Sequence, residues 1–471
     1  MISITRDKKS GPVGKAAAVL FWIAVWQAAS MAVGQEILLA SPAAVLIRLA
    51  ELLTHADFWR SIGFSMIRIL LGFLMGTAAG ILLAGLASCV PWVRALAAPA
   101  VMTVKAIPVA SFVILVLIWI PSENLSVVIS FLMVFPIIYT NVLGGIESAD
   151  RKLLEMAEVF QLSRMRRIRC IYIPQINPFL CSGCSVALGL CWKAGVAAEV
   201  IGIPDGSIGE RLYQAKIYLN TPDLFAWTLV IIAVSLIFEK LFLALICRAV
   251  RLLEEDSNAV WKERKCRKSP PAPPGGQSEG GFVEARHLYM SYGSNRVLED
   301  LSVRFPEGRI TCIMAPSGRG KTTLLRLLMG LEQPDSGEIT GVSGRKTAAV
   351  FQEDCLCPNL SAAANACLAL KRSEISTDRL IQSFREMRLE ECLNRPVRSL
   401  SGGMKRRVAI LRALLAHWDI LFLDEPFQGL DADTRKQVLQ TVRRQCAGRT
   451  VICVTHEEQD ARELGAELVK L

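Results

Sequence analysis

The chain has 471 residues, a formal net charge of +10 and a hydrophobic fraction of 52%. This length allows two or three domains, and the apolar fraction excludes a chain built only from ordinary soluble domains. In a chain with long apolar runs, a positive charge of this size typically reflects basic cytoplasmic loops rather than nucleic-acid binding. We therefore expect the lipid bilayer, and no nucleic acid, among its partners.

Six apolar stretches in the first half of the chain are long enough to cross a membrane. The first follows a basic N-terminal segment, so a cleaved signal peptide is a competing interpretation; we prefer a retained helix because further spans follow. The predicted fold of residues 1–250 is an all-α domain of six transmembrane helices. The spans are Ala16–Gly34, Ile62–Ala87, Ala98–Ile120, Leu125–Gly145, Pro178–Ile203 and Leu224–Ile246.

Loop charge predicts the orientation of these spans. The loop at residues 146–177 carries six basic residues, and the positive-inside rule places it in the cytoplasm. With six spans, both chain termini then lie in the cytoplasm as well. We expect a multi-pass protein of the cytoplasmic membrane, with its N-terminus and its C-terminal half on the cytoplasmic side.

Span five contains two ionisable residues, Lys193 and Glu199. A charge at the centre of a membrane helix costs about 2.5–3.5 kcal/mol on insertion scales, so such residues are expected to face the bundle interior or a wet pathway. Both are therefore candidate residues of a substrate path, in which Lys193 would attract an anion. The alternative is a structural bond to a neighbouring helix.

The basic loop also has apolar residues at helical spacing, in LLEMAEVF (153–160). A basic amphipathic helix beside the membrane would have the same pattern. The stretch resembles the EAA loop of ABC importer permeases, whose short helix docks on the ATPase. This resemblance assigns the coupling contact to Glu155, Ala157 and Ser163. Met156 and Gln161 depart from the family pattern, in which Ala and Gly are usual.

The wider run from Leu39 to Cys247 is similar to the nitrate/sulfonate/taurine permease family. The matching pieces are ASPAAV (40–45), IRILLGFLMGTAAG (67–80), LLEMAEVF (153–160), IYIPQINPFL (171–180) and GVAAEVIG (195–202). The resemblance implies a permease domain that works with a separate extracytoplasmic substrate-binding protein.

Residues 251–281 form a charged, Pro- and Gly-rich linker, a composition typical of a flexible tether. From Phe282 onward the composition is that of a soluble α/β domain, which we assign to residues 282–471. Strand-like runs with helical stretches between them predict a parallel sheet flanked by helices. The runs are Phe282–Leu288, Val297–Phe305, Arg309–Met314, Thr347–Phe351, Ile420–Leu423 and Thr450–Val454.

A phosphate-binding loop is predicted where the third of these strands meets a helix. The loop reads APSGRGKTT, and a strand, a small-residue loop with Gly-Lys-Thr and a helix form the P-loop arrangement. Its backbone N–H groups and the helix N-terminus would surround phosphate oxygens. A Gly- and Ser-rich turn without a nucleotide is the alternative. The predicted ATP-binding residues are Ala315, Pro316, Ser317, Gly318, Arg319, Gly320, Lys321, Thr322 and Thr323.

Individual residues of the loop have distinct predicted roles. Gly318 and Gly320 allow close backbone approach because they lack Cβ. Lys321 would reach the β- and γ-phosphates, and the Thr322 hydroxyl would ligate Mg²⁺. Ala315 stands where the pattern has Gly; if the position needs a positive φ, Ala costs about 1 kcal/mol, and otherwise little. We expect hydrolysis to survive.

Two further motifs complete the predicted site. In ILFLDE (420–425), the strand-end Asp424 would hold Mg²⁺ through water, and Glu425 would polarise the attacking water. In LSGGM (400–404), a second anion-binding helix N-terminus is predicted. Its ATP-binding residues are Ser401, Gly402 and Gly403.

Together these motifs resemble the ATP-binding-cassette ATPases. The resemblance implies that Tyr292 stacks on adenine, that Gln352 senses Mg²⁺ and the membrane domain, and that His456 is the switch histidine at the γ-phosphate. It also identifies QGLD (428–431) as the D-loop. The expected catalytic residues are Glu425, His456 and Gln352, and the expected Mg²⁺ residues are Thr322, Gln352 and Asp424.

In this family, each ATP site combines the P-loop of one domain with the LSGGM loop of another. The resemblance therefore implies a homodimer that uses ATP and Mg²⁺ to import a small, anionic solute such as a sulfonate, taurine or nitrate. Two alternatives stay open. One is an ABC exporter, because a membrane domain followed by an ATPase is the usual exporter layout. The other is an ATP-regulated channel or membrane ATPase without uptake.

Overall fold

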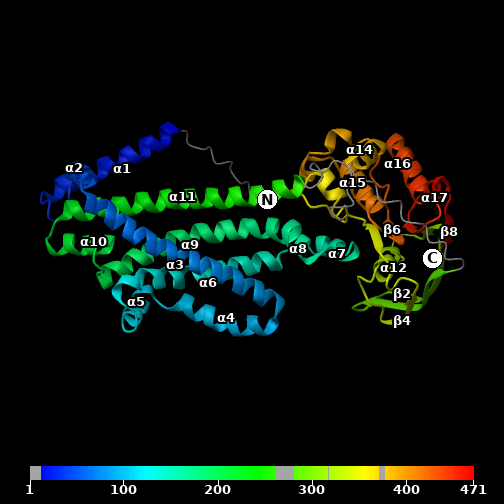
Figure 1. Ribbon diagram of the computed structural model, residues 1–471, viewed down its shortest axis with the longest axis horizontal. Helices are drawn as coiled ribbons and strands as arrows, with labels where there is room; N and C mark the ends of the chain where they lie inside the picture. Colours follow the sequence, from blue (N-terminus) through cyan, green and yellow to red (C-terminus); the bar gives the residue numbers. More distant parts are fainter. Residues whose placement is uncertain (1–11, 260–280, 317, 371–376, 471) are drawn as a thin grey trace. The chain divides into compact units, whose positions relative to one another are not determined.

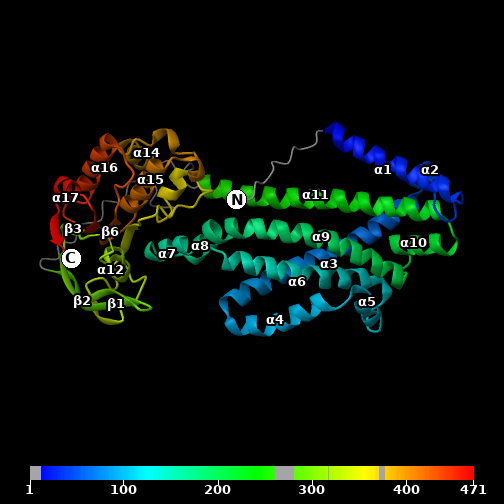
Figure 2. The same ribbon diagram turned by 180° about the vertical axis from the view of Figure 1, so that it is seen from behind.

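The computed structural model describes residues 12–259, 281–316, 318–370 and 377–470 (Figures 1 and 2). The chain divides into two compact units. The first contains residues 1–148 and 176–248, and the second contains residues 149–175 and 249–471. Ser317 and most of the predicted linker lie outside the described residues.

The described part of the first unit is helical. It contains α1 (Pro12–Val33), α2 (Pro42–Thr54), α3 (Ala56–Cys89), α4 (Pro91–Ala106), α5 (Val109–Leu117), α6 (Ser122–Glu147), most of α9 (Ile173–Gly202), α10 (Ile208–Ile217) and most of α11 (Thr221–Ala259). Within the described residues, five helices are long and apolar enough to cross a membrane. Each of these helices overlaps one of the predicted spans, and only the third predicted span, Ala98–Ile120, has no such single helix.

The predicted span Ala98–Ile120 is not one straight helix. The structure divides it between α4 and α5, which are bent by 101° at a break between them. The break falls at Pro108, which has no backbone N–H and disfavours helical backbone at the preceding Ile107. The pair counts as a sixth span only if the two helices cross together.

Glycines let α3 and α6 pack closely. Gly72, Gly76 and Gly80 lie four residues apart on α3, so they share one helix face. A Cβ at Gly72 would lie 2.3 Å from the carbonyl oxygen of Val127, and one at Gly76 would lie 3.0 Å from that of Phe131. Helix α3 accordingly packs closely on α6, and it lies across α6 in both views (Figures 1 and 2).

The second unit begins with the loop that resembles an EAA loop. It forms α7 (Arg151–Val159), α8 (Arg164–Arg167) and the π-helical turn η1 (Ile168–Tyr172). Asp150 starts α7 by accepting a hydrogen bond from the backbone N–H of Lys152 at 2.9 Å. The apolar face of α7 is buried in the same hydrophobic cluster as residues of the C-terminal α/β domain. The structure therefore groups this loop with the C-terminal α/β domain, whereas the sequence predicts it within the domain of residues 1–250.

The remaining strands of this unit form two sheets. A five-stranded parallel sheet has the order β5-β6-β7-β3-β8, and a three-stranded antiparallel sheet has the order β2-β1-β4. The strands are β1 (Phe282–Tyr292), β2 (Asn295–Pro306), β3 (Ile310–Met314), β4 (Ser336–Thr340), β5 (Thr347–Val350), β6 (Ile420–Asp424), β7 (Thr450–Val454) and β8 (Glu467–Lys470).

The prediction of a single parallel sheet is wrong for the first two strands. β1 and β2 are joined by the two residues Gly293 and Ser294, and so short a connection allows only antiparallel pairing. β4 and β8 were not among the predicted strands. The other four strands of the parallel sheet agree with the prediction, and β6 and β7 are buried along their whole length, as strands covered on both faces require.

Helices flank the parallel sheet. They are α12 (Lys321–Leu328), α13 (Ala362–Ala366), α14 (Thr377–Glu386), α15 (Gly402–Leu415), α16 (Ala432–Gln445) and α17 (Glu458–Leu464). Short 3₁₀ turns lie at Glu390–Cys392 and Val397–Ser399. The site residues lie at the carboxyl ends of β3, β5, β6 and β7, which are adjacent parallel strands and so end at one edge.

Candidate functional site

The loop between β3 and α12 has the backbone of a phosphate cradle. Gly318 and Gly320 have φ values of +83° and +75°, a region that glycine enters without steric cost. A Cβ at Gly320 would also lie 2.6 Å from the Leu298 side chain. The Lys321 ammonium donates to the carbonyl oxygens of Ala315 at 2.7 Å and Pro316 at 3.0 Å.

The backbone at Ala315 decides whether its departure from glycine matters. Ala315 is not among the described residues with a positive φ, so an alanine there has no left-handed strain to bear. The departure from glycine is therefore not a conformational defect of the loop.

One cavity brings together residues from four strand ends. It has a volume of about 300 Å³ and contains all three predicted catalytic residues. Its lining residues are Val297, Gly318, Gly320, Lys321, Thr322, Thr323, Gln352, Glu425 and His456. Gln352 follows β5, Glu425 follows β6 and His456 follows β7, so the parallel register of the sheet places them side by side.

Glu425 is held in an unusual backbone conformation. Its φ is +47°, which is uncommon for a residue with a side chain. Its N–H donates to the carbonyl oxygen of Val454 at 2.9 Å, and one carboxylate oxygen lies 2.7 Å from Nε2 of His456. Two adjacent strand ends therefore orient this carboxylate toward the cavity.

The residues at the end of β6 also fit a magnesium ion. Asp424 is 4% exposed, and its Oδ1 has no hydrogen-bond partner among the described residues. Burial raises the pKa of this carboxyl, while a hydrogen bond from Thr322 opposes that effect. An orphaned buried carboxylate oxygen beside a P-loop hydroxyl is a donor set of the kind that Mg²⁺ binds. Thr322 and Asp424 would hold the ion, with Gln352 nearby in the cavity.

Some of the predicted ATP contacts are absent from the lining of this cavity. Neither Tyr292 nor the segment Ser401–Gly403 is among the described residues that line it. Ser401 caps α15 by accepting a hydrogen bond from the N–H of Met404 at 3.4 Å, and it is exposed with Gly402. Tyr292 is 46% exposed, and its hydroxyl donates to Glu332. Their roles remain predictions.

The predicted coupling residues belong to the loop that packs against the C-terminal α/β domain. The carboxylate of Glu155 pairs in bidentate fashion with the Arg326 guanidinium of α12, with both N–O distances at 2.9 Å. This pairing lowers the pKa of Glu155. Arg326 also donates to Glu332 at 2.7 Å. Glu332 also accepts a hydrogen bond from the Tyr292 hydroxyl. A series of polar contacts therefore connects Glu155 of α7 to the residue predicted to stack on adenine.

Other contacts reinforce this docking. Ala157 is fully buried, and Ser163 occupies the N-cap position of α8. Arg166, within α8, donates to the carbonyl oxygens of Leu368 and Leu370 at 2.6 and 2.9 Å. Lys152 pairs with Glu353, directly after Gln352.

The candidate substrate-path residues do not meet. Glu199 is fully buried and accepts hydrogen bonds from the Ser65 hydroxyl at 2.6 Å and the Gly209 N–H at 3.3 Å. Lys193 is exposed on the same helix. The contacts of Glu199 favour the structural alternative for that residue, while the surroundings of Lys193 leave its role a prediction.

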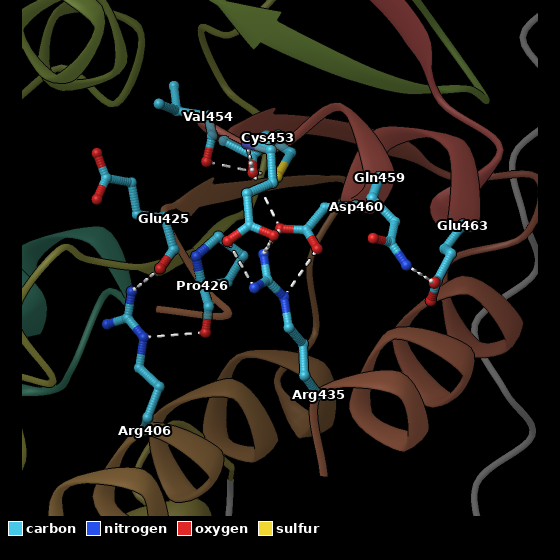
Figure 3. Close-up of polar contacts among 11 residues, drawn as sticks. Arg406, Glu425, Pro426, Arg435, Cys453, Val454, Gln459, Asp460 and Glu463 are labelled. Carbon is cyan, nitrogen blue, oxygen red and sulfur yellow. Dashed lines mark hydrogen bonds and ion pairs between the residues drawn. The ribbon is translucent and has the colours of Figure 1, made fainter. Parts of the chain in front are cut away.

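Two arginines near the site were not predicted from the sequence. Arg435 of α16 forms a bidentate pair with Asp460 at 2.9 and 2.7 Å (Figure 3). Asp460 also accepts a hydrogen bond from the hydroxyl of Thr455, the residue before His456. Arg406 of α15 contacts the backbone at Glu425 and Pro426 (Figure 3). Arg406 had a sequence signal, because it lies three and four residues before the apolar Ala409 and Ile410 and hence on the buried face of its helix.

Comparison with known proteins identifies both halves of the chain. Residues 76–251 match the family described as binding-protein-dependent transport system inner membrane component. Residues 298–428 match the ABC transporter family. The chain therefore joins a permease domain of that type to an ATP-binding-cassette ATPase domain.

Similar proteins are found in bacteria. The chain is 35% identical to the spermidine/putrescine import ATP-binding protein PotA of Haemophilus influenzae, over 40% of this chain and 55% of that protein. It is 34% identical to the Fe(3+) ions import ATP-binding protein FbpC 1 of Pectobacterium atrosepticum, over 39% of this chain and 56% of that protein. The chain thus spans about half the length of the curated relatives it matches. A dimeric structure of the bacterial ABC transporter cassette MJ0796 is 28% identical, covers 40% of this chain and 94% of that one, and has a TM-score of 0.37.

Proposed function

We propose that two copies of this chain form an ATP-driven importer of the cytoplasmic membrane. The observation that carries the proposal is the docking of the loop between α6 and α9 on the ATPase. Leu153, Met156 and Ala157 are buried against it, and Glu155 pairs with Arg326 of the P-loop helix. A change at the nucleotide thereby has a direct mechanical connection to the chain segment that leads into the spans.

Hydrolysis is assigned to the cavity at the strand ends. The P-loop backbone and Lys321 bind the phosphates, and Glu425 orients a water for attack on the γ-phosphorus. The bond from that phosphorus to the bridging oxygen of ADP then breaks, releasing ADP and phosphate. His456, 2.7 Å from Glu425, keeps this carboxylate in position. Bound Mg²⁺ would neutralise phosphate charge.

The placement of the LSGGM loop supports a homodimer. Ser401 and Gly402 are exposed at the start of α15 and lie outside the cavity of their own domain. A second copy of the chain would present its own Ser401–Gly403 to complete each site. ATP binding then favours a closed dimer, in which the Ser401–Gly403 segment of one copy meets the P-loop of the other, because only this state offers both halves of the site.

The solute is proposed to be small and to carry an anionic group: a sulfonate, taurine or nitrate. The support is the similarity of Leu39–Cys247 to the nitrate/sulfonate/taurine permeases and the exposed Lys193 in span five. A separate extracytoplasmic binding protein would deliver it. The named relatives import spermidine/putrescine and Fe(3+), so these cations are the natural comparison substrates.

Uptake by reconstituted protein tests the proposal. Proteoliposomes that contain the full chain, internal Mg·ATP and the purified binding protein should accumulate labelled taurine or nitrate. A Glu425→Gln chain should bind ATP and lose uptake and hydrolysis by about two orders of magnitude, because the water is no longer polarised. Uptake of putrescine in place of the anions would contradict the solute class. Efflux alone, or an ATP-dependent current without accumulation, would contradict import.

A further inference from the structure

Arg406 is a buried side chain of the LSGGM helix that makes several polar contacts near the predicted site. It lies on α15, is 4% exposed and is absent from the lining of the nucleotide cavity. Its guanidinium reaches two chain segments, the loop after β5 and the turn after β6. The first contains Gln352 and the second contains Glu425.

The contacts to the turn after β6 are the closer set. Nη2 donates to the carbonyl oxygen of Asp424 at 2.8 Å and to that of Glu425 at 2.6 Å, and Nε donates to that of Pro426 at 3.0 Å. Figure 3 shows the guanidinium of Arg406 against Glu425 and Pro426. Three successive carbonyl groups are thus bound by one rigid, planar side chain.

The contacts to the loop after β5 use the remaining nitrogen. Nη1 donates to the carbonyl oxygens of Phe351 at 2.5 Å and Gln352 at 3.2 Å, and it lies 3.4 Å from the carboxylate of Asp354. All three guanidinium nitrogens therefore have partners, as a buried charge requires. Because β5 and β6 are adjacent parallel strands, one side chain on α15 can bridge both strand ends.

This bridge explains how Glu425 keeps its left-handed backbone. A residue with φ of +47° persists only when its surroundings over-determine it. The Glu425 N–H is bound by Val454 on one side, and its carbonyl oxygen is bound by Arg406 on the other. With both ends of the residue bound, the direction of its carboxylate into the cavity is set.

We propose that Arg406 is a positioning residue for ATP hydrolysis: it holds the backbone of Glu425 and Gln352 in register, so that the LSGGM helix sets the geometry of the water-activating carboxylate. The inference rests on the proposed hydrolysis in this cavity and is independent of the proposed solute and transport direction. Because Arg406 is not among the described residues that line the cavity, its proposed action is through Glu425 rather than on ATP.

Arg412 is a matched control on the same helix. It is also fully buried, and it donates to the carbonyl oxygens of Cys355 at 2.6 Å and Asp354 at 3.3 Å. It therefore holds α15 to the same loop after β5, and its hydrogen bonds go to that loop rather than to the turn that contains Glu425. If α15 merely packs less well against the loop, substitution of either arginine should have the same effect. If Glu425 is no longer positioned, only substitution of Arg406 should lower kcat.

Steady-state hydrolysis by the full chain in lipid nanodiscs tests the proposal. Arg406→Met should lower kcat about 100-fold with KM for ATP within about 3-fold, because phosphate binding is retained and water activation is lost. Arg406→Gln keeps an amide donor without a buried charge, so its kcat should be about 10-fold higher than that of Arg406→Met. Arg412→Met should lower the melting temperature while kcat of the folded fraction stays within about 3-fold.

A double-mutant cycle with Glu425→Gln separates positioning from a structural role. If Arg406 acts through Glu425, adding Arg406→Met to Glu425→Gln should lower the residual kcat by less than about 3-fold, and both single variants should retain unhydrolysed ATP after gel filtration. Additive losses, wild-type turnover in Arg406→Met, or loss of bound nucleotide would each overturn the proposal. No hydrolysis by the wild-type chain would overturn it together with the proposed ATPase site, whereas hydrolysis without uptake would overturn only the import proposal.

Discussion

At the scale of single residues, backbone conformation decides which departures from a motif matter. Glu425 carries the strain of a positive φ at the centre of the predicted chemistry, and its neighbours on β7 and α15 bind both of its peptide groups. Ala315 deviates from the P-loop pattern yet has no such strain. The φ angle at a motif position therefore shows better than the residue type whether a departure from the motif strains the backbone.

Ala315→Gly provides a test at this scale. Because the position does not need a positive φ, the glycine should leave ATP hydrolysis within about 2-fold of wild type. It should also lower stability by roughly 0.5–1 kcal/mol, since glycine gains more freedom in the unfolded chain. Parallel kcat and thermal-unfolding measurements on both chains check this. A large gain in hydrolysis would show that the alanine does distort the loop.

At the scale of elements, two helix contacts have clear energetic consequences. The first is the docking of α7, where Glu155 and Arg326 are mostly buried and form a bidentate pair. The second is the close packing of α3 on α6, which depends on glycines at the contact. In each case a neighbouring position on the same element offers a control.

Glu155→Gln should weaken the docking of α7 in a pH-dependent way. Arg326 holds the pKa of Glu155 below its ordinary value of 4.5. A depressed carboxyl pKa contributes stability that is present above the unfolded-state value and is lost as pH falls through the folded-state value. The variant should therefore be less stable by roughly 1–2 kcal/mol at neutral pH, between the values for exposed and buried pairs.

The stability difference from wild type should stay constant from about pH 8 to pH 6. It should begin to shrink as pH falls below the ordinary value of 4.5 and be lost as pH falls through the lower folded-state pKa. Thermal unfolding of the two chains over this range measures it. Lys152→Gln is the matched control, because its pair with Glu353 is 54% and 66% exposed and exposed pairs contribute about 0–1 kcal/mol. Equal effects of both variants would contradict the assigned importance of Glu155.

Gly72→Ala should destabilise the permease domain. Its Cβ would lie 2.3 Å from the Val127 carbonyl oxygen and 2.8 Å from the Ser130 Cβ, so α3 and α6 must separate. Overpacking of this kind costs roughly 1–3 kcal/mol. Gly85→Ala on the same helix meets no atom within 4 Å and should be neutral. Melting of the detergent-solubilised chains compares the two, and equal melting temperatures would show that α3 and α6 adjust freely.

At the scale of the whole molecule, Ser401–Gly403 are not among the described residues that line the cavity. The proposed homodimer would build each site from the P-loop of one copy and the LSGGM loop of the other. This arrangement predicts complementation between two inactive chains, which a site built within one chain cannot produce.

Lys321→Ala and Gly402→Asp chains should each lose hydrolysis. When they are co-expressed in equal amounts, half of the dimers carry one copy of each, and one of their two sites is intact. The mixture should recover about a quarter of wild-type hydrolysis if the two sites act independently. Affinity tags of two kinds isolate the mixed dimers for assay. No recovery in isolated mixed dimers would argue against shared sites.

Much of the site was predictable from short segments because nucleotide chemistry requires particular residues close together in the chain. The P-loop, the strand-end carboxylates and the strand preceding His456 are local patterns, and the structure gathers Lys321, Gln352, Glu425 and His456 around one cavity. Parallel strands end at one sheet edge, which makes this gathering a consequence of strand order.

The sequence by itself determined the apolar spans, the α/β composition of the second half and the order of the nucleotide motifs. These depend on local periodicity and on residue types within a few positions of one another. Only the tertiary structure decided the 101° bend between α4 and α5, the separate antiparallel sheet and the burial of Glu199 apart from the exposed Lys193. It alone placed Arg406 between two strand ends. Such features depend on contacts between residues far apart in the chain, and local patterns do not specify which partner a buried charge will meet.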